Sequence, residues 1–176
     1  PSASTQCMPG GRKTCNLLNQ KSDNEIKSLV IGTHASAFPK RTLIEEPYTF
    51  VCQGEGPKTI DMLLHILKNK NLNQLNNVPG LWYMADNQVS SNPMAPMFED
   101  LDNDLPGQEW SLLDMNKYKA HNWHTFDNLE TRNKYASLQT SLGCPFKCTF
   151  CCINAPFQRN TIRCWSPKHV IKEIKY

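Results

Sequence analysis

An apolar segment that ends in glycines and runs straight into an amphipathic helix constrains the fold more than any other feature. Residues 49–56 (TFVCQGEG) are typical of a buried strand and a turn, in which Gly54 and Gly56 can take conformations closed to other residues. Residues 57–69 (PKTIDMLLHILKN) then predict a helix, with a proline suited to its first position. The strand–turn–helix order predicts an α/β fold.

The predicted helix is amphipathic, and a second strand–helix pair precedes it. Its apolar residues recur at i, i+3, i+4 and i+7 and so share one face: Ile60, Leu63, Leu64 and Leu67. Residues 27–32 (KSLVIG) predict a buried strand, and residues 39–47 (PKRTLIEEP) predict a short helix between prolines. Strands that alternate with helices in this way favour a parallel sheet.

The middle of the chain, residues 71–133, is rich in Asn and Pro and has no sustained period, so we expect an ordered linker there. Within it, residues 78–93 predict a small hairpin with Asp86 and Asn87 at its tip. Residues 100–115 are expected to form an extended connector.

Regular structure is expected again near the C-terminus. Residues 135–143 (YASLQTSLG) alternate apolar and polar side chains and predict a strand that ends in glycine. Residues 166–176 predict a helix in which Ser166 is the N-cap and Pro167 the first residue.

Composition excludes several classes of protein. The net charge is +3, from 19 basic and 16 acidic residues, and no basic stripe predicts a nucleic-acid partner. No apolar run approaches the roughly 18 residues of a membrane span, and no signal peptide is visible. Eight cysteines without a secretory signal favour a reducing, cytoplasmic location over a disulfide framework.

Cys144, Cys148 and Cys151 follow the spacing Cys-x3-Cys-x2-Cys directly after the last predicted strand. Soft thiolates in such a group select zinc, copper(I) or an iron–sulfur cluster. A zinc site needs a fourth ligand, which Cys164 or His169 could supply. A four-iron cluster held by three thiolates leaves one iron open to another ligand.

The segment GCPFKCTFCC resembles the signature loop of the radical S-adenosylmethionine superfamily, in which an aromatic residue precedes the last cysteine. The resemblance implies that Cys144, Cys148 and Cys151 hold a 4Fe-4S cluster, that S-adenosylmethionine chelates the open iron, and that Phe150 contacts S-adenosylmethionine. Reductive cleavage of the sulfonium would then give a 5′-deoxyadenosyl radical. Cys152 matches no ligand position and is expected to be a small buried side chain.

The N-terminal part of the chain, including IGTHASAFPKRTLIEEPYTFVCQGEG, resembles the subgroup that carries a cobalamin-binding domain before the radical domain. In that family, a Ser-x-Leu and a later Gly-Gly line the cleft for the nucleotide tail of cobalamin. By spacing, Ser2, Gly32 and Thr33 would take this role, although Ser4 replaces the Leu and Thr33 replaces the second Gly. The resemblance therefore implies cobalamin as a further cofactor.

We expect three segments: residues 1–70, the C-terminal part of a Rossmann-like cobalamin-binding domain; residues 71–133, an interdomain linker; and residues 134–176, the start of the radical domain with its cluster loop. The last segment would be the first βα unit of a partial TIM-type barrel. Because such barrels need about 250 residues, the chain is expected to be a fragment too short to be active alone.

The expected function is reductive cleavage of S-adenosylmethionine, coupled to methyl transfer or a radical rearrangement on a small or lipid-like substrate. Flavodoxin or ferredoxin would be the electron donor. Two alternatives remain: a zinc-binding structural or interaction module, and an electron-transfer protein. The spacing of Cys7, Cys15 and Cys52 does not match the second cluster of methylthiotransferases, so these three are expected to be structural thiols.

Overall fold

The structure is a computed structural model that describes residues 4–23, 25–120 and 133–175. Ser2, one of the predicted cobalamin residues, lies outside the described residues, as do residues 121–132 of the predicted linker. No helix in the described part is long and apolar enough to cross a bilayer.

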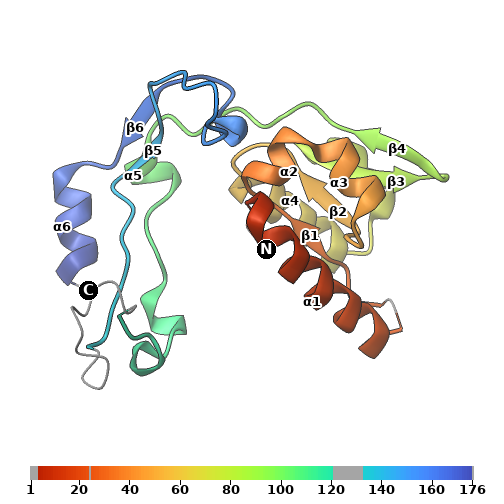
Figure 1. Cartoon of the computed structure of the whole chain (residues 1–176), viewed down its shortest axis with the longest axis horizontal. Coiled ribbons are helices and arrows are strands. Elements are labelled where there is room, and N and C mark those ends of the chain that lie inside the picture. The colour runs from red at the N-terminus through yellow and green to blue at the C-terminus, as the bar shows by residue number, and fades with distance from the viewer. Residues whose placement is uncertain (1–3, 24, 121–132, 176) are drawn as a thin grey trace. The chain divides into compact units, whose positions relative to one another are not determined.

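The chain divides into two compact units. Figure 1 colours the chain by residue number. The first consists of Pro1–Met97 with Gly143–Thr161, and the second of Phe98–Leu142 with Ile162–Tyr176. The elements of the first unit, in chain order, are η1 (Thr5–Cys7), α1 (Met8–Lys21), β1 (Leu29–Val30), α2 (Thr33–Ala37), α3 (Pro39–Glu45), β2 (Phe50–Cys52), α4 (Pro57–Lys68), η2 (Leu72–Asn77), β3 (Leu81–Ala85), β4 (Gln88–Ser91) and η6 (Ala155–Phe157). The predicted α/β class is confirmed.

The sheet of the first unit is mixed, with the strand order β1-β2-β3-β4. β1 and β2 are parallel, with Leu29 opposite Phe50 and Val30 opposite Val51. β3 is antiparallel to both β2 and β4. The predicted parallel pairing of the strands in the first 70 residues is therefore confirmed, and the predicted hairpin after α4 adds two antiparallel strands to the same sheet. This mixed sheet is compatible with a fragment of a Rossmann-like fold.

The hairpin β3–β4 confirms the predicted tip at Asp86 and Asn87. Both residues have positive φ, 49° and 60°. A two-residue hairpin turn whose twist matches that of the strands requires such values. The hairpin lies within residues 71–133, and β3 pairs directly with β2. Leu81 and Tyr83 alternate inward along β3 and are buried, so the hairpin is held by the core as well as by its ladder.

The two faces of the sheet carry separate cores, since neighbouring strand residues point to opposite sides. Val30 and Val51 face the helices α1, α2 and α3. Leu29 and Phe50 face α4. Figure 1 shows these helices around the strands of the first unit.

Helix α4 begins as predicted, with Pro57 after Gly56, whose φ is 104°. Its buried face differs from the predicted one. Leu63 and Ile66 are 3% and 7% exposed, whereas Leu64 is 60% exposed. The apolar face of the helix is wider than the surface that it packs against. Leu63 and Ile66 therefore face the core, while Leu64 remains largely in solvent.

Helix α1 has no counterpart among the predicted elements, because Gly10 and Gly11 lower helix propensity. Tertiary packing supports it instead: Met8 and Cys15 are buried in the core against α3 and the strands. A Cβ atom on Gly11 would collide with the hydroxyl of Tyr48. Glycine at this position therefore permits the close approach of the helix.

In its described residues, the second unit contains short helices, two short strands and a terminal helix: α5 (Leu101–Asp104), η3 (Trp110–Leu112), η4 (Met115–Lys117), β5 (Ser141–Gly143, whose last residue belongs to the first unit), β6 (Ile162–Cys164) and α6 (Pro167–Lys175). The extended connector predicted for 100–115 is wrong, because aspartates cap helical turns there. The side chain of Asp100 accepts a hydrogen bond from the Asn103 N–H at 3.2 Å.

Helix α6 confirms its predicted start. Pro167 is its first residue, and Ser166 Oγ accepts a hydrogen bond from the His169 N–H at 3.1 Å. The Ser166 N–H donates to Asp102 Oδ1 at 2.9 Å, and this bond joins α6 to α5.

The strand predicted over 135–143 is shorter than expected. Only β5 (Ser141–Gly143) is a strand, and it pairs with β6. Alternation of side chains creates a strand only where a partner supplies the ladder, and no strand partner extends along 135–140 within the described residues.

Candidate metal-binding loop

The predicted cluster cysteines lie in the loop that leaves β5. Cys144 follows the last strand residue directly and is half-buried, while Cys148 and Cys151 are exposed. The Cys151 N–H donates to the carbonyl of Cys148 at 3.2 Å, which places these two residues at the ends of one tight turn.

A side-chain clamp closes the base of the loop. Asn154 Oδ1 accepts a hydrogen bond from the Cys144 N–H at 2.9 Å, and Asn154 Nδ2 donates to the Cys144 carbonyl at 2.8 Å. The same Nδ2 donates to Asn160 Oδ1 at 3.1 Å. Sequence analysis gave Asn154 no role, because no periodic signal marks a contact between a side chain and backbone ten residues apart.

The loop supplies the donor atoms of a metal site without gathering them. All eight cysteines, each within the described residues, are free thiols. Among the residues that the structure describes, no three His, Cys, Asp or Glu side chains come close enough together to hold a metal ion. The donors fit a thiolate-ligated metal by chemical type, accessibility and proximity in sequence.

Two other loop residues are exposed. Phe150, the predicted contact for S-adenosylmethionine, is 91% exposed. Cys152 is also exposed, so the prediction of a small buried side chain is wrong. The chain turns again here, with the Ala155 N–H donating to the Cys152 carbonyl at 3.0 Å, before any side chain reaches a core.

The remaining cysteines divide by burial. Cys15 and Cys52 are buried, at 3% and 0% exposure, as expected of structural thiols, whereas Cys7 is exposed. Cys15 Sγ donates to the Pro47 carbonyl at 3.0 Å. Burial raises the pKa of the Cys52 thiol, while a hydrogen bond with Thr59 acts in the opposite direction. Cys15 belongs to the core that faces α1, α2 and α3, and Cys52 contacts Thr59 of α4, so both buried thiols are part of the packing around the first sheet.

The predicted cobalamin residues Gly32 and Thr33 follow the carboxyl end of β1. Gly32 has a φ of 112° and precedes Thr33, the first residue of α2. Both are half-buried. The carboxyl ends of parallel strands are where open α/β sheets place ligands.

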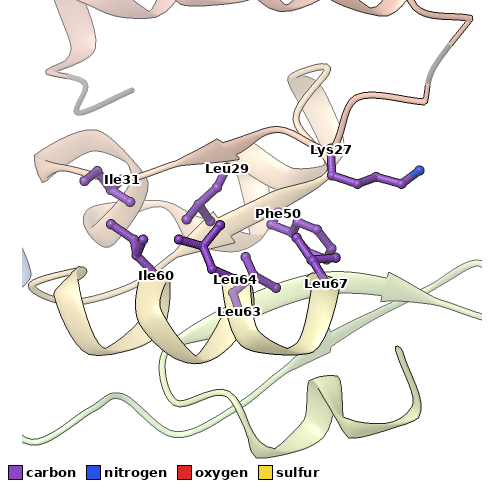
Figure 2. A pocket seen from close by; sticks show the side chains of 8 residues that line it. All are labelled: Lys27, Leu29, Ile31, Phe50, Ile60, Leu63, Leu64 and Leu67. Carbon is purple, nitrogen blue, oxygen red and sulfur yellow. The ribbon is translucent and has the colours of Figure 1, made fainter. Parts of the chain in front are cut away.

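The first unit also contains an open apolar pocket of about 270 Å³ between the sheet and α4. Figure 2 shows the side chains that line it: Lys27, Leu29, Ile31, Phe50, Ile60, Leu63, Leu64 and Leu67. The amine of Lys27 points away from the apolar side chains. None of the predicted site residues lines this pocket.

Comparison with known proteins identifies enzymes that are similar to this chain. The chain is 31% identical over 156 residues to an uncharacterized methyltransferase of Pyrococcus horikoshii, a match that covers 88% of this chain and 31% of that protein. It is 34% identical over 110 residues to an anaerobic magnesium-protoporphyrin IX monomethyl ester cyclase of Synechocystis, covering 62% of this chain and 19% of the cyclase.

The chain is a relative of these enzymes. A cyclase of the same name from Rubrivivax gelatinosus is 27% identical over 154 residues, covering 86% of this chain and 26% of the cyclase. These relatives confirm the resemblance to cobalamin-type radical S-adenosylmethionine proteins. The chain spans a third or less of the length of the three relatives described here. No protein-family model matches the chain.

Proposed function

We propose that the chain is part of a radical S-adenosylmethionine enzyme in which Cys144, Cys148 and Cys151 hold a 4Fe-4S cluster. One observation carries the proposal: three free thiols, accessible or half-buried, share a single loop directly after a strand. A backbone turn joins Cys148 and Cys151, and the Asn154 side chain holds the backbone of Cys144.

The division of roles follows from the chain's own residues. Three thiolates match three irons and leave the fourth for S-adenosylmethionine. Phe150 precedes Cys151 in the chain, and its side chain is exposed. When bound, such a cluster supplies the electron that cleaves S-adenosylmethionine reductively. The protein orients the reactants and excludes water.

The proposed reaction is methyl transfer or a radical rearrangement, assisted by cobalamin. The relatives named as a methyltransferase and as cyclases support this class of chemistry. Gly32 and Thr33, at the carboxyl end of β1, would line the cobalamin cleft together with Ser2. The substrate would be small or lipid-like, the electron donor a flavodoxin or ferredoxin, and the location cytoplasmic.

The proposed domain plan keeps residues 1–70 as Rossmann-like and 134–176 as the start of a partial barrel. Residues 71–133 link the two and also add the β3–β4 hairpin to the first sheet. The parallel β1–β2 pair, with α2 and α3 between its strands in the chain, supports the first part. Connections between parallel strands are right-handed in about 98% of cases. Because α1 and α3 cover the same face, a parallel strand that preceded α1 would by this rule pair with the edge of β1 that carries no strand among the described residues.

Anaerobic reconstitution with iron and sulfide tests the proposal. The purified protein should take up about four iron and four sulfide per chain. It should also give an electron spin resonance signal, after reduction, that changes when S-adenosylmethionine is added. Stoichiometric zinc binding without cluster assembly would refute the proposal.

The second candidate is a zinc-binding structural or interaction module. The exposure of Cys152 favours it, since this places a fourth accessible thiol in the loop. Cys164 and His169 are further candidate ligands. Replacing each of these three residues in turn should weaken zinc binding if this candidate is correct, and should leave cluster content unchanged if the radical enzyme is correct.

A further inference from the structure

We infer that Asn154 is a positioning residue for the first cluster ligand, holding the backbone of Cys144 in place before any metal binds. The inference rests on the proposed function and deepens it, since it assigns a role at the same loop to a residue outside the cysteine motif. Asn154 is half-buried at the base of the loop, ten residues beyond Cys144.

The contact uses both hydrogen-bonding groups of the Cys144 backbone. The N–H donates to Asn154 Oδ1 at 2.9 Å, and the carbonyl accepts from Nδ2 at 2.8 Å. A backbone N–H can only donate and a carbonyl can only accept, so these partners fix the orientation of the carboxamide. Asn160 Oδ1, which accepts from the same Nδ2 at 3.1 Å, is consistent with that orientation.

This two-point contact replaces a neighbouring strand. In an antiparallel ladder, a hydrogen-bonded residue exchanges both its N–H and its carbonyl with its partner. Strand β5 ends at Gly143, and the Asn154 side chain gives the next residue the same pair of bonds. Cys144 is thereby held as if the strand continued, while Cys148 and Cys151 lie on the exposed part of the loop.

The backbone before Cys144 is constrained as well. Gly143 has a φ of 86°, and a Cβ atom there would collide with the carbonyl oxygen of Thr161. The base of the loop is therefore fixed at two consecutive residues: Gly143 through its close approach to Thr161, and Cys144 through its bonds to Asn154. Such a base limits the directions in which the Cys144 thiol can point.

The chemistry of the side chain predicts which replacements matter. Alanine removes both bonds to Cys144. Aspartate is nearly isosteric and keeps the acceptor for the Cys144 N–H, but it cannot donate to the carbonyl. Asn92→Ala is a matched control, because Asn92 Nδ2 donates to the carbonyls of Leu75 and Val78 at 2.7 and 2.8 Å, away from the loop.

The first measurement uses the metal-free protein. Amide hydrogen exchange followed by nuclear magnetic resonance should show the Cys144 N–H protected in the wild type and in Asn154→Asp, and unprotected in Asn154→Ala. Asn92→Ala should leave this protection intact. Equal exchange of the Cys144 amide in the wild type and in Asn154→Ala would overturn the clamp.

The second measurement uses the reconstituted protein and follows iron loss to a chelator. Removing a residue that supports a metal ligand commonly weakens metal binding about 10- to 100-fold, so Asn154→Ala should lose iron at least about tenfold faster than the wild type. Asn92→Ala should match the wild type, and Asn154→Asp should fall between. The reduced cluster of Asn154→Ala should also give an altered electron spin resonance spectrum.

The outcomes separate the two proposals. A wild-type cluster that Asn154→Ala retains equally well, with an unchanged spectrum, would overturn the role of Asn154 alone. Equal loss of iron from Asn154→Ala and Asn92→Ala would make Asn154 merely structural and would also overturn it. Failure of the wild type to assemble a cluster would overturn the proposed function, and the metal role of Asn154 with it.

Discussion

Gly143 and Thr161 approach each other so closely that a methyl group on Gly143 would collide with the carbonyl oxygen of Thr161. Gly143→Ala should therefore destabilise the protein by about 1–3 kcal/mol. The collision is one cause, and the positive φ at this position, which is unfavourable for alanine, is the other. Thermal unfolding followed by circular dichroism measures the change.

Gly10→Ala is the control for that substitution. Gly10 lies within α1, and nothing lies within 4 Å of a Cβ atom built on it. The same exchange should stabilise the helix there by up to about 1 kcal/mol. If both variants changed stability in the same direction, backbone crowding at Gly143 would not be the cause.

Neighbouring leucines of α4 should respond differently to truncation. Leu63→Ala should cost about 2–5 kcal/mol, since Leu63 is 3% exposed and its removal leaves a cavity. Leu64→Ala should cost less than about 1 kcal/mol, since Leu64 is 60% exposed. Urea unfolding of the two variants compares them, and similar losses would contradict the buried face assigned to the helix.

Serine substitutions should sort the loop cysteines. Cys148→Ser should abolish most iron uptake, because a three-thiolate site cannot spare a ligand. Cys152→Ser should bind as much iron as the wild type, although its thiol is equally exposed. Iron and sulfide analysis after anaerobic reconstitution gives the answer. Equal losses in the two variants would favour a site that uses all four thiols.

The second unit should weaken in acid. Hydrogen bonds from the Ser166 side chain and backbone hold the pKa of Asp102 below its ordinary value. A lowered pKa stabilises the fold above the pKa of the unfolded chain, about 3.9, and that stability is lost as the pH falls through the folded value. Stability should therefore decline below about pH 4. Asp102→Asn should show a smaller decline when melting temperatures are compared across pH.

The Tyr48 hydroxyl is buried, and the structure shows no hydrogen-bond partner for it among the described residues. Burial also raises the pKa of Tyr48. Tyr48→Phe should thus change the unfolding free energy by no more than about 1 kcal/mol, whereas Tyr48→Ala should cost about 3–5 kcal/mol. A large loss in the phenylalanine variant would reveal a partner for the hydroxyl.

Local signals in the sequence predicted the elements that depend on local chemistry. Pro57 after Gly56 starts α4, Asp86 and Asn87 form the hairpin tip, and Ser166 caps α6. In each case the residue type satisfies a backbone requirement within a few positions, so the pattern alone is enough.

Long-range contacts explain what the sequence did not reveal. Helix α1 forms despite Gly11 because Met8 and Cys15 pack in the core, and the glycine leaves room for the Tyr48 hydroxyl. Strand β5 is short because its only partner strand in the described residues, β6, is short. Cys152 is exposed because the loop turns before reaching a core. The clamp between Asn154 and Cys144 joins residues whose proximity only the folded loop creates.

The mixed sheet has a consequence for the order in which the first unit assembles. The β3–β4 ladder joins residues that are neighbours along the chain, from Ala85 opposite Gln88 outward. The parallel β1–β2 pair joins Leu29 to Phe50, which α2 and α3 separate along the chain. Since local contacts form faster than distant ones, we expect the hairpin to appear early in refolding. The β2–β3 pair, which joins more distant residues such as Phe50 and Tyr83, should complete the sheet last.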